Sequence, residues 1–154
     1  MRLMKMFFAP FLAICAVFAF GASASMAATG AGWSDDYEGA LARAKAEKKL
    51  VFLEFTGSDW CPICTMLDKE VLSKQEFKDY ASQNLVLVEL DFPQFKTQPQ
   101  KLMERNEKLR QKYDIPGFPI VVVLNSAGKR IATLNYEPGG VQPFLAKLSK
   151  LKGK

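Results

Sequence analysis

The sequence predicts an α/β fold built on a mixed β-sheet, and three observations lead to this prediction. Two apolar runs, residues 50–55 and 85–91, have the length and composition of buried strands, and helical patterns separate them. A third run, residues 120–124, is β-branched almost throughout and leads through turn residues into a fourth strand, residues 130–136. Because helices alternate with the strands, the sheet is expected to be flanked by helices.

The N-terminal segment has the pattern of a signal peptide. Two basic residues precede an apolar run at residues 7–20, and a small-x-small site ends at Ala27. The apolar run is shorter than the roughly 20 residues that a membrane-spanning helix needs, which disfavours an uncleaved anchor. We therefore expect residues 1–27 to be removed before Ala28, and residues 28–154 to form a single domain.

The cysteines divide between the two parts of the chain. Cys15 lies in the apolar run, where the preceding residues loosely resemble a lipoprotein signal, but Ile14 is too bulky for the position before the cysteine. We expect Cys15 to leave with the signal peptide. The mature chain then holds only Cys61 and Cys64. It lacks a structural disulfide framework, although a signal peptide implies an oxidising compartment outside the cytoplasm.

Charge and composition exclude several classes of function. Loss of the two basic residues of the signal peptide lowers the net charge from +5 to +3, which is too mild and too dispersed to indicate nucleic-acid binding. The chain contains no histidine. This excludes histidine acid–base catalysis, histidine metal sites, and serine or cysteine nucleophiles activated by histidine.

The first helix is expected over residues 35–48. Ser34 precedes it as a candidate N-cap, and acidic residues occupy the first turn, where they favour the helix dipole. Residues 28–32 are small and are interpreted as a linker. The first strand, residues 50–55, follows the helix directly.

A second helix is expected to begin near Cys61 and to continue to about Leu72. Ser73 is the candidate N-cap of a short helical segment at residues 75–81. The strand at residues 85–91 completes a βαβ unit, so the first two strands are expected to be parallel with a right-handed connection.

The second half of the chain continues the alternation. Residues 92–99 form a polar insertion that contains proline, and residues 101–113 predict a charged helix. Residues 114–119 contain tight-turn sequences ahead of the third strand. The hairpin turn at residues 125–129 joins the last two strands, and an amphipathic helix is expected over residues 141–151.

The segment 57–64, Gly-Ser-Asp-Trp-Cys-Pro-Ile-Cys, lies between a predicted strand and a predicted helix. Two cysteines three positions apart at such a junction are typical of a redox-active dithiol. Cys61 would occupy the helix N-terminus, which favours the nucleophilic thiolate, and Cys64 would lie one turn further on. Pro62 suits the first helical turn, where its missing N–H costs little. An inert disulfide or half of a metal site is the alternative.

Glu54 is the one acidic residue inside the first apolar strand. A carboxylate in this setting is costly unless it is protonated or partnered, so a raised pKa is expected. The alternative is a side chain at the sheet edge that faces solvent.

The order of elements, with Trp-Cys-x-x-Cys at the first strand–helix junction and x-Pro before a hairpin, resembles the thioredoxin fold over residues 33–151. Finer motifs are similar to periplasmic thioredoxin-like proteins related to the reducing domains of disulfide-interchange systems; they lie at residues 55–64, 66–68, 91–93, 117–119 and 136–140. The resemblance implies a central four-stranded sheet in the order 2-1-3-4, with the last two strands as the hairpin.

The resemblance also implies roles for the dithiol and its support. Cys61 would be the attacking nucleophile and Cys64 the resolving thiol. Glu54 matches the buried acid that accepts the proton of the resolving cysteine, provided that the loop after the strand is one residue longer here. Trp60 would shield the dithiol.

A substrate-binding surface follows from the same resemblance. Pro119 matches a cis-proline that packs against the dithiol, and the neighbouring backbone would pair with substrate peptide as an added strand. Phe118 would face the substrate, with an ordinary core aromatic as the alternative. Trp60, Pro62 and Ile63 complete the set of residues expected to contact substrate.

The expected activity is that of a periplasmic thiol:disulfide oxidoreductase acting as a reductase or isomerase of protein disulfides. Pro62 and Ile63 provide no cation to stabilise the thiolate, which favours a reducing dithiol. No cofactor is expected beyond the Cys61–Cys64 couple. Disulfide-bonded proteins are the expected substrates, a membrane thiol transporter is the implied electron donor, and the chain is expected to be monomeric.

Two other classes of function stay open at this point. A metallochaperone would bind Cu(I) through Cys61 and Cys64, with Met66 as a further soft ligand. A non-catalytic peptide-binding module would use the Phe118–Pro119 edge. Within the redox class, the sequence does not separate dedicated reduction of apocytochrome cysteines from broad specificity.

Overall fold

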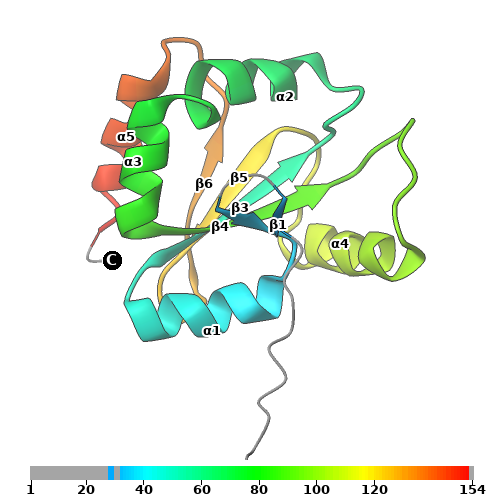
Figure 1. The fold of residues 1–154 in the computed structure, drawn as a ribbon, viewed down its shortest axis with the longest axis horizontal. Coiled ribbons are helices and arrows are strands. Elements are labelled where there is room, and N and C mark those ends of the chain that lie inside the picture. Colours follow the sequence, from blue (N-terminus) through cyan, green and yellow to red (C-terminus); the bar gives the residue numbers. More distant parts are fainter. Residues whose placement is uncertain (1–27, 30–31, 153–154) are drawn as a thin grey trace, which may run out of the picture.

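The computed structural model describes residues 28–29 and 32–152, so the predicted signal peptide at residues 1–27 lies outside the described residues. Within this range the chain forms a six-stranded mixed sheet with helices on both faces (Figure 1). The elements are β1 (Ala28–Thr29), β2 (Trp33–Ser34), α1 (Tyr37–Glu47), β3 (Leu50–Thr56), α2 (Pro62–Leu67), η1 (Asp68–Leu72), α3 (Gln75–Asn84), β4 (Leu85–Asp91), α4 (Gln100–Lys112), β5 (Ile120–Leu124), β6 (Arg130–Asn135) and α5 (Val141–Ser149).

The four predicted strands occupy the predicted positions in the sheet. β3 pairs parallel with β4 on one side and antiparallel with β5 on the other, and β5 pairs antiparallel with β6 as a hairpin. The spatial order β4-β3-β5-β6 confirms the order 2-1-3-4. The parallel pair follows from the helical crossover between β3 and β4.

The sheet is larger than predicted because two short strands extend it beyond β4. β2 pairs parallel with β4, with Trp33 opposite Leu87 and Ser34 opposite Val88, and β1 pairs antiparallel with β2. The interpretation of residues 28–32 as a linker was therefore wrong for its first two residues. Two-residue strands are too short to show a hydrophobic period, so only the unpaired edge of β4 determines where they form.

Two predicted helix caps were also wrong. Ser34 belongs to β2, and the N-cap of α1 is Asp36, whose Oδ1 accepts a hydrogen bond from the Gly39 amide at 3.0 Å. Ser73 does not cap α3; its hydroxyl instead donates to Asp68 Oδ1 at 2.8 Å. Both serines lie near the start of a helix, but their side chains form other local hydrogen bonds instead of capping it.

The helix predicted from Cys61 to Leu72 consists of two parts. α2 is α-helical, and the chain then continues in the wider π-helical segment η1. α3 extends to Asn84, beyond the predicted end at residue 81, and the Asn84 side chain donates to the Tyr80 carbonyl at 2.7 Å. The other helix ends lie within two residues of the predicted positions.

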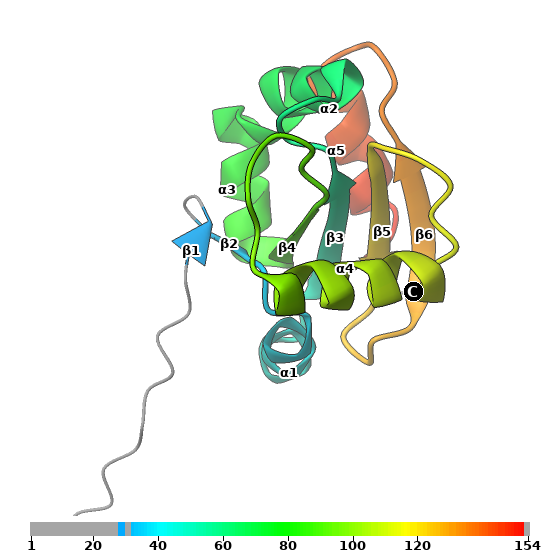
Figure 2. The same cartoon turned by 90° about the vertical axis from the view of Figure 1, so that its right-hand side faces the viewer.

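The sheet divides the interior into two cores (Figure 2). α1 and α4 cover one face, where Val51, Leu53 and Phe55 of β3 point. α2, η1, α3 and α5 cover the other face, which receives Phe52. Since side chains alternate along a strand, Glu54 points to the same face as Phe52, beneath α2 and η1.

The candidate site lies where the carboxyl ends of β3 and β4 meet the start of β5. The loop that carries the dithiol leaves β3 at this edge, and the insertion 92–99 leaves β4 beside it (Figures 1 and 2). Ligand sites of open parallel sheets commonly occur at this end of the strands. No helix among residues 28–29 and 32–152 has the length and apolar character to cross a membrane.

Candidate active site

Cys61 and Cys64 form a disulfide across the first turn of α2, with their Cα atoms 5.3 Å apart. Cys61 is the N-cap residue, and its Sγ accepts a hydrogen bond from the Cys64 amide at 3.2 Å. Pro62 occupies the first helical turn as predicted. An amide aimed at Cys61 Sγ, at the positive end of a helix, stabilises a thiolate at this position once the disulfide is reduced.

The two sulfur-bearing residues are almost fully covered. Cys61 is 6% exposed and Cys64 3% exposed. The Gly57 amide lies 3.5 Å from Cys64 Sγ and donates to it. Cys61, at the N-terminus of α2, is the more exposed of the two residues, and Cys64 is the more deeply buried.

The Trp60 indole lies beside the dithiol. Its Nε1 donates to the Phe92 carbonyl at 2.8 Å, and its ring meets Phe118 edge to face with centroids 5.9 Å apart. Gly57 makes room for the indole, because a Cβ atom there would lie 2.5 Å from Trp60 Cε2. The indole is 36% exposed, so one side is available for contact with another molecule.

The peptide bond between Phe118 and Pro119 is cis, which confirms the prediction made for Pro119. A shallow groove of about 340 Å³ lies beside it, and Ile63, Phe118 and Pro119 all line this groove. The groove connects α2 with the start of β5. Ile63 is 49% exposed, and Pro62 next to it is also exposed, so both present apolar surface next to the dithiol.

Phe118 combines the two interpretations that the sequence left open. Its ring is half-buried and packs on Phe92 with centroids 4.9 Å apart, while the Arg110 guanidinium lies 5.9 Å from its centroid. The same side chain lines the groove next to Pro119. Phe118 thus anchors the loop before β5 in the core and also contributes to the surface that a substrate would meet.

Glu54 lies under the dithiol, inside the sheet and not at its edge. β4 and β5 flank its strand, and the residue is 6% exposed, so the alternative of an outward-facing edge side chain was wrong. Glu54 and Cys64 line the same cavity of about 470 Å³, which we call the dithiol cavity. Burial raises the pKa of Glu54 to about 8, and the nearby carboxylates of Glu89, Asp68 and Asp91 add to the rise. The raised pKa predicted from the sequence is confirmed.

The structure also shows a role for Asp59 that the sequence does not indicate. Its carboxylate accepts the backbone amides of Gln94, Phe95 and Lys96 at 2.7–2.9 Å. These bonds outweigh desolvation and lower the pKa of Asp59. Asp59 therefore fastens the insertion 92–99 to the dithiol loop. No local signal indicates this contact, because its partners lie 35–37 positions away.

A second contact joins the dithiol loop to the end of β4. Asp91 accepts the Ser58 amide at 2.9 Å through Oδ1 and the Ser58 hydroxyl at 2.6 Å through Oδ2. The dithiol loop is therefore tied to β4 as well as to the insertion. This double attachment holds Cys61 in place relative to the sheet and to Glu54.

Two features near the site complete its surroundings. Met66, the further ligand considered for Cu(I), is 42% exposed on α2, and no group of three or more Cys, Asp or Glu side chains in residues 28–29 and 32–152 is arranged to hold a metal ion.

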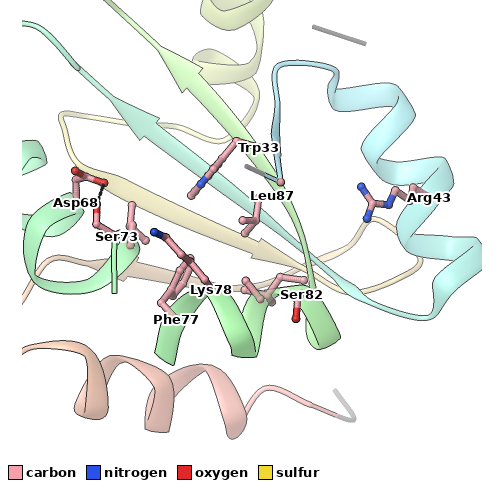
Figure 3. Close-up of a pocket in the computed structure, with 12 residues that line it drawn as sticks. Trp33, Arg43, Asp68, Ser73, Phe77, Lys78, Ser82 and Leu87 are labelled. Atoms are coloured by element: carbon pink, nitrogen blue, oxygen red, sulfur yellow. Dashed lines mark hydrogen bonds between the residues drawn. The ribbon is translucent and has the colours of Figure 1, made fainter. Parts of the chain in front are cut away.

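A separate cavity of about 350 Å³ lies between β2, η1 and α3 (Figure 3). Trp33 and Asp68 line both this cavity and the dithiol cavity, but neither cysteine reaches it.

Comparison with known proteins agrees with this geometry. A family model described as thioredoxin-like matches residues 32–126. The disulfide bond reductase DsbH of Chlamydia pneumoniae is 38% identical over 114 residues, which cover 74% of this chain and 69% of the relative. The thioredoxin-related protein DsbJ of the same organism is 29% identical over 64% of this chain but only 28% of its own length.

Solved structures give the same result. A structure described as DsbH oxidoreductase superposes with a TM-score of 0.72 at 33% identity, covering 87% of this chain and 96% of that one. A disulphide isomerase from Xylella fastidiosa Temecula1 superposes with a TM-score of 0.57 at 30% identity, covering 73% and 87%. With its Cys-x-x-Cys at the start of α2, its cis-proline and its sheet order, this chain belongs to the thioredoxin-like family.

Proposed function

We propose that this protein is a thiol:disulfide oxidoreductase that reduces disulfide bonds in other proteins through Cys61 and Cys64. The observation that carries the proposal is the Cys61–Cys64 disulfide at the N-terminus of α2, with a shallow groove lined by Ile63 and Pro119 next to it and the buried Glu54 in the cavity that Cys64 lines. The groove allows a peptide to approach Cys61, and Glu54 can exchange a proton with Cys64. Similarity to a disulfide bond reductase supports the same activity.

The reaction begins with the reduced dithiol. The Cys61 thiolate attacks one sulfur of a substrate disulfide, the substrate S–S bond breaks, and the other substrate sulfur leaves as a thiolate that takes a proton from water. Cys64 then gives its proton to Glu54 and attacks Cys61 Sγ. The bond between Cys61 and the substrate breaks, and the second substrate sulfur leaves as a thiolate that takes a proton from water. Two electrons have moved from the dithiol to the substrate, and the Cys61–Cys64 disulfide has formed.

The residues around the dithiol have distinct parts in this sequence. The Cys64 amide and the N-terminus of α2 stabilise the attacking thiolate. The exposed faces of Trp60 and Ile63 and the groove beside Pro119 contact the substrate chain. Glu54, shielded from water, accepts the proton that Cys64 must lose.

Reduction is the favoured direction for two reasons. Pro62 and Ile63 between the cysteines carry no charge, so only the helix terminus and amides stabilise the thiolate, and a less stabilised thiolate corresponds to a more reducing couple. In addition, the relative of 38% identity is described as a disulfide bond reductase. Isomerisation of substrate disulfides uses the same attack by Cys61 and is the related activity to test alongside.

We further propose that the protein works outside the cytoplasm, in the periplasm. The support is the signal-peptide pattern of residues 1–27. A reductase in an oxidising compartment needs a continuous supply of electrons, so a membrane protein that carries thiol electrons outward is the class of donor that fits. Export would be tested by fractionating cells that express the full chain and by determining the N-terminus of the mature protein.

The activity would be tested by two measurements on the chain from residue 28 onward. The first follows reduction of a protein disulfide with dithiothreitol as electron source, comparing the wild type with Cys61→Ser. The second measures the reduction potential by tryptophan fluorescence, with Trp60 beside the dithiol as the reporter, against defined glutathione or dithiothreitol ratios. A potential near −270 mV, as for thioredoxin, supports a reductase, whereas one near −120 mV identifies an oxidant. Absence of any reversible transition would contradict redox activity altogether.

A further inference from the structure

Glu54 has a second carboxyl group directly beside it. Glu54 on β3 and Glu89 on β4 are register partners in neighbouring parallel strands. Their side chains point to the same face of the sheet, and both line the dithiol cavity together with Cys64. The two acids therefore share one cavity beneath the dithiol.

The other neighbours of Glu54 do not neutralise it. On its other side the register partner is the apolar Val121 of β5. The charged or titratable groups that reach the dithiol cavity from the surrounding elements are Asp91 of β4, Asp68 of η1, Cys64 of α2 and Lys96 of the insertion, with Asp35 before α1 acting on Glu89. No hydrogen bond or ion pair joins the Glu54 side chain to another side chain among the residues that the structure describes.

Among the described residues that line the cavity, Lys96 is the one that is basic, and its ammonium group is bonded to Ser58. Its Nζ lies 3.3 Å from Ser58 Oγ and donates to it, and Ser58 in turn donates to Asp91. The positive charge is thus held at the Ser58–Asp91 side of the cavity. It lowers the pKa of Glu89 but does not contribute to that of Glu54.

The two acids differ in their access to solvent. Glu54 is 6% exposed, whereas Glu89 is half-buried. Burial, followed by the Asp91 carboxylate, also raises the pKa of Glu89. Two carboxyl groups in one cavity, each with its charged form disfavoured by burial, do not readily ionise together, because each negative charge disfavours the other. The more exposed member of the pair ionises first.

We propose that Glu54 and Glu89 hold one proton between them at neutral pH, and that Glu89 is a positioning residue that keeps this proton on Glu54. The proposal rests on the proposed function and extends it to a residue that does not touch the dithiol. Glu89 acts through its negative charge, which makes the carboxylate form of Glu54 less favourable.

This arrangement serves the step in which the electron donor reduces the Cys61–Cys64 disulfide back to the dithiol. A thiolate of the donor dithiol attacks Cys61 Sγ, the Cys61–Cys64 bond breaks, and Cys64 leaves as a thiolate. The proton on Glu54 passes to Cys64. The second donor thiol then loses its proton to water and attacks the donor sulfur that is bonded to Cys61, so that the donor disulfide forms, Cys61 leaves as a thiolate and two electrons have been transferred. A Glu54 that is protonated in the oxidised protein supplies this proton within the cavity, and the carboxylate that remains takes the proton back from Cys64 when the dithiol reduces the next substrate.

The test is an infrared titration of the oxidised protein between pH 5 and 10, following the carbonyl band of a protonated, buried carboxyl group. Glu54→Gln assigns the band by removing it. In the wild type we expect the band to disappear with a midpoint of about 8. In Glu89→Gln we expect the midpoint to fall by about one pH unit or more, because the neighbouring charge is gone. Glu89→Asp, which retains the charge, should keep most of the wild-type midpoint.

Glu104→Gln is the matched control, since it removes one negative charge from the exposed face of α4. An unchanged midpoint in Glu89→Gln, or an equal fall in Glu104→Gln, overturns the proposal. Should Glu89→Gln fold poorly, Glu89→Ser provides a second neutral variant. The pH midpoint of the rate of dithiothreitol reduction should move with the infrared midpoint. Protein-disulfide turnover by the wild type at a single pH tests the proposed function separately, since it does not depend on the infrared result.

Discussion

Replacing Glu54 with Gln should stabilise the oxidised protein, and the gain should grow as the pH rises. The pKa of Glu54 is about 8 in the folded chain, against 4.5 for an unperturbed glutamate. A carboxyl group whose pKa is raised on folding costs stability once the unfolded chain can ionise and the folded chain cannot. Glutamine has the shape of the protonated acid and does not ionise, so it removes this cost.

The magnitude follows from the two pKa values. Below pH 4.5 both states are protonated and the substitution should have little effect. Between pH 4.5 and 8 the wild type should lose about 1.4 kcal/mol of unfolding free energy per pH unit relative to the variant. The difference should reach roughly 3 kcal/mol at pH 7 and level off near 5 kcal/mol above pH 8.

The assay is equilibrium urea unfolding of both proteins, with the disulfide intact, at intervals from pH 4 to pH 9. Taking the difference between the two curves cancels the titration of all other groups that the substitution does not perturb. Glu104→Gln, on the exposed face of α4, should follow the wild-type curve. Parallel curves for the wild type and Glu54→Gln over this range would refute the raised pKa, and with it the assignment of Glu54 as a proton carrier at neutral pH.

Three further predictions concern the dithiol loop. Cys61→Ser should abolish turnover, whereas Cys64→Ser should accumulate a mixed disulfide with substrate that mass spectrometry detects; full activity in either variant would contradict the assigned roles. Gly57→Ala should cost about 2 kcal/mol, because the new Cβ displaces the indole and breaks its hydrogen bond to Phe92 and its contact with Phe118. In a Trp60→Ala background the same change should cost little, and strictly additive costs in this double-mutant cycle would argue against the steric explanation. Asp59→Ala should speed hydrogen exchange at the amides of residues 94–96, which lose their acceptor, while exchange in α3 stays constant; equal protection in both proteins would show that the insertion does not depend on Asp59.

The strands could be predicted because each carries its own signal. Residues 50–55, 85–91 and 120–124 are apolar runs of strand length, and their burial on both faces of the sheet explains why they show no alternation. The hairpin turn is equally local. The dithiol could be predicted for the same reason, since both cysteines and the proline between them lie within four consecutive residues.

Elements that form only through contact with another segment of the chain were predicted less well. β1 and β2 exist because β4 offers an unpaired edge, and a two-residue strand has no pattern of its own. Ser34 and Ser73 had the composition of helix caps, but Asp36 and Asp68 compete for the local hydrogen bonds. Local sequence preference cannot tell which of two neighbouring polar side chains caps a helix. The hydrogen-bond energies of the two candidates differ by less than the energy that the surrounding packing contributes.

The sequence by itself determined the fold class, the strand order through a resemblance, the dithiol and the expectation that an acid within an apolar strand has a raised pKa. Only the tertiary structure decided which groups surround that acid and what holds the dithiol loop. Glu54 and Glu89 come together through pairing of parallel strands, and Asp59 meets the insertion across 35–37 positions of sequence. The physical reason is that pKa values and loop positions depend on distances between side chains that are remote along the chain, and chain folding alone sets those distances.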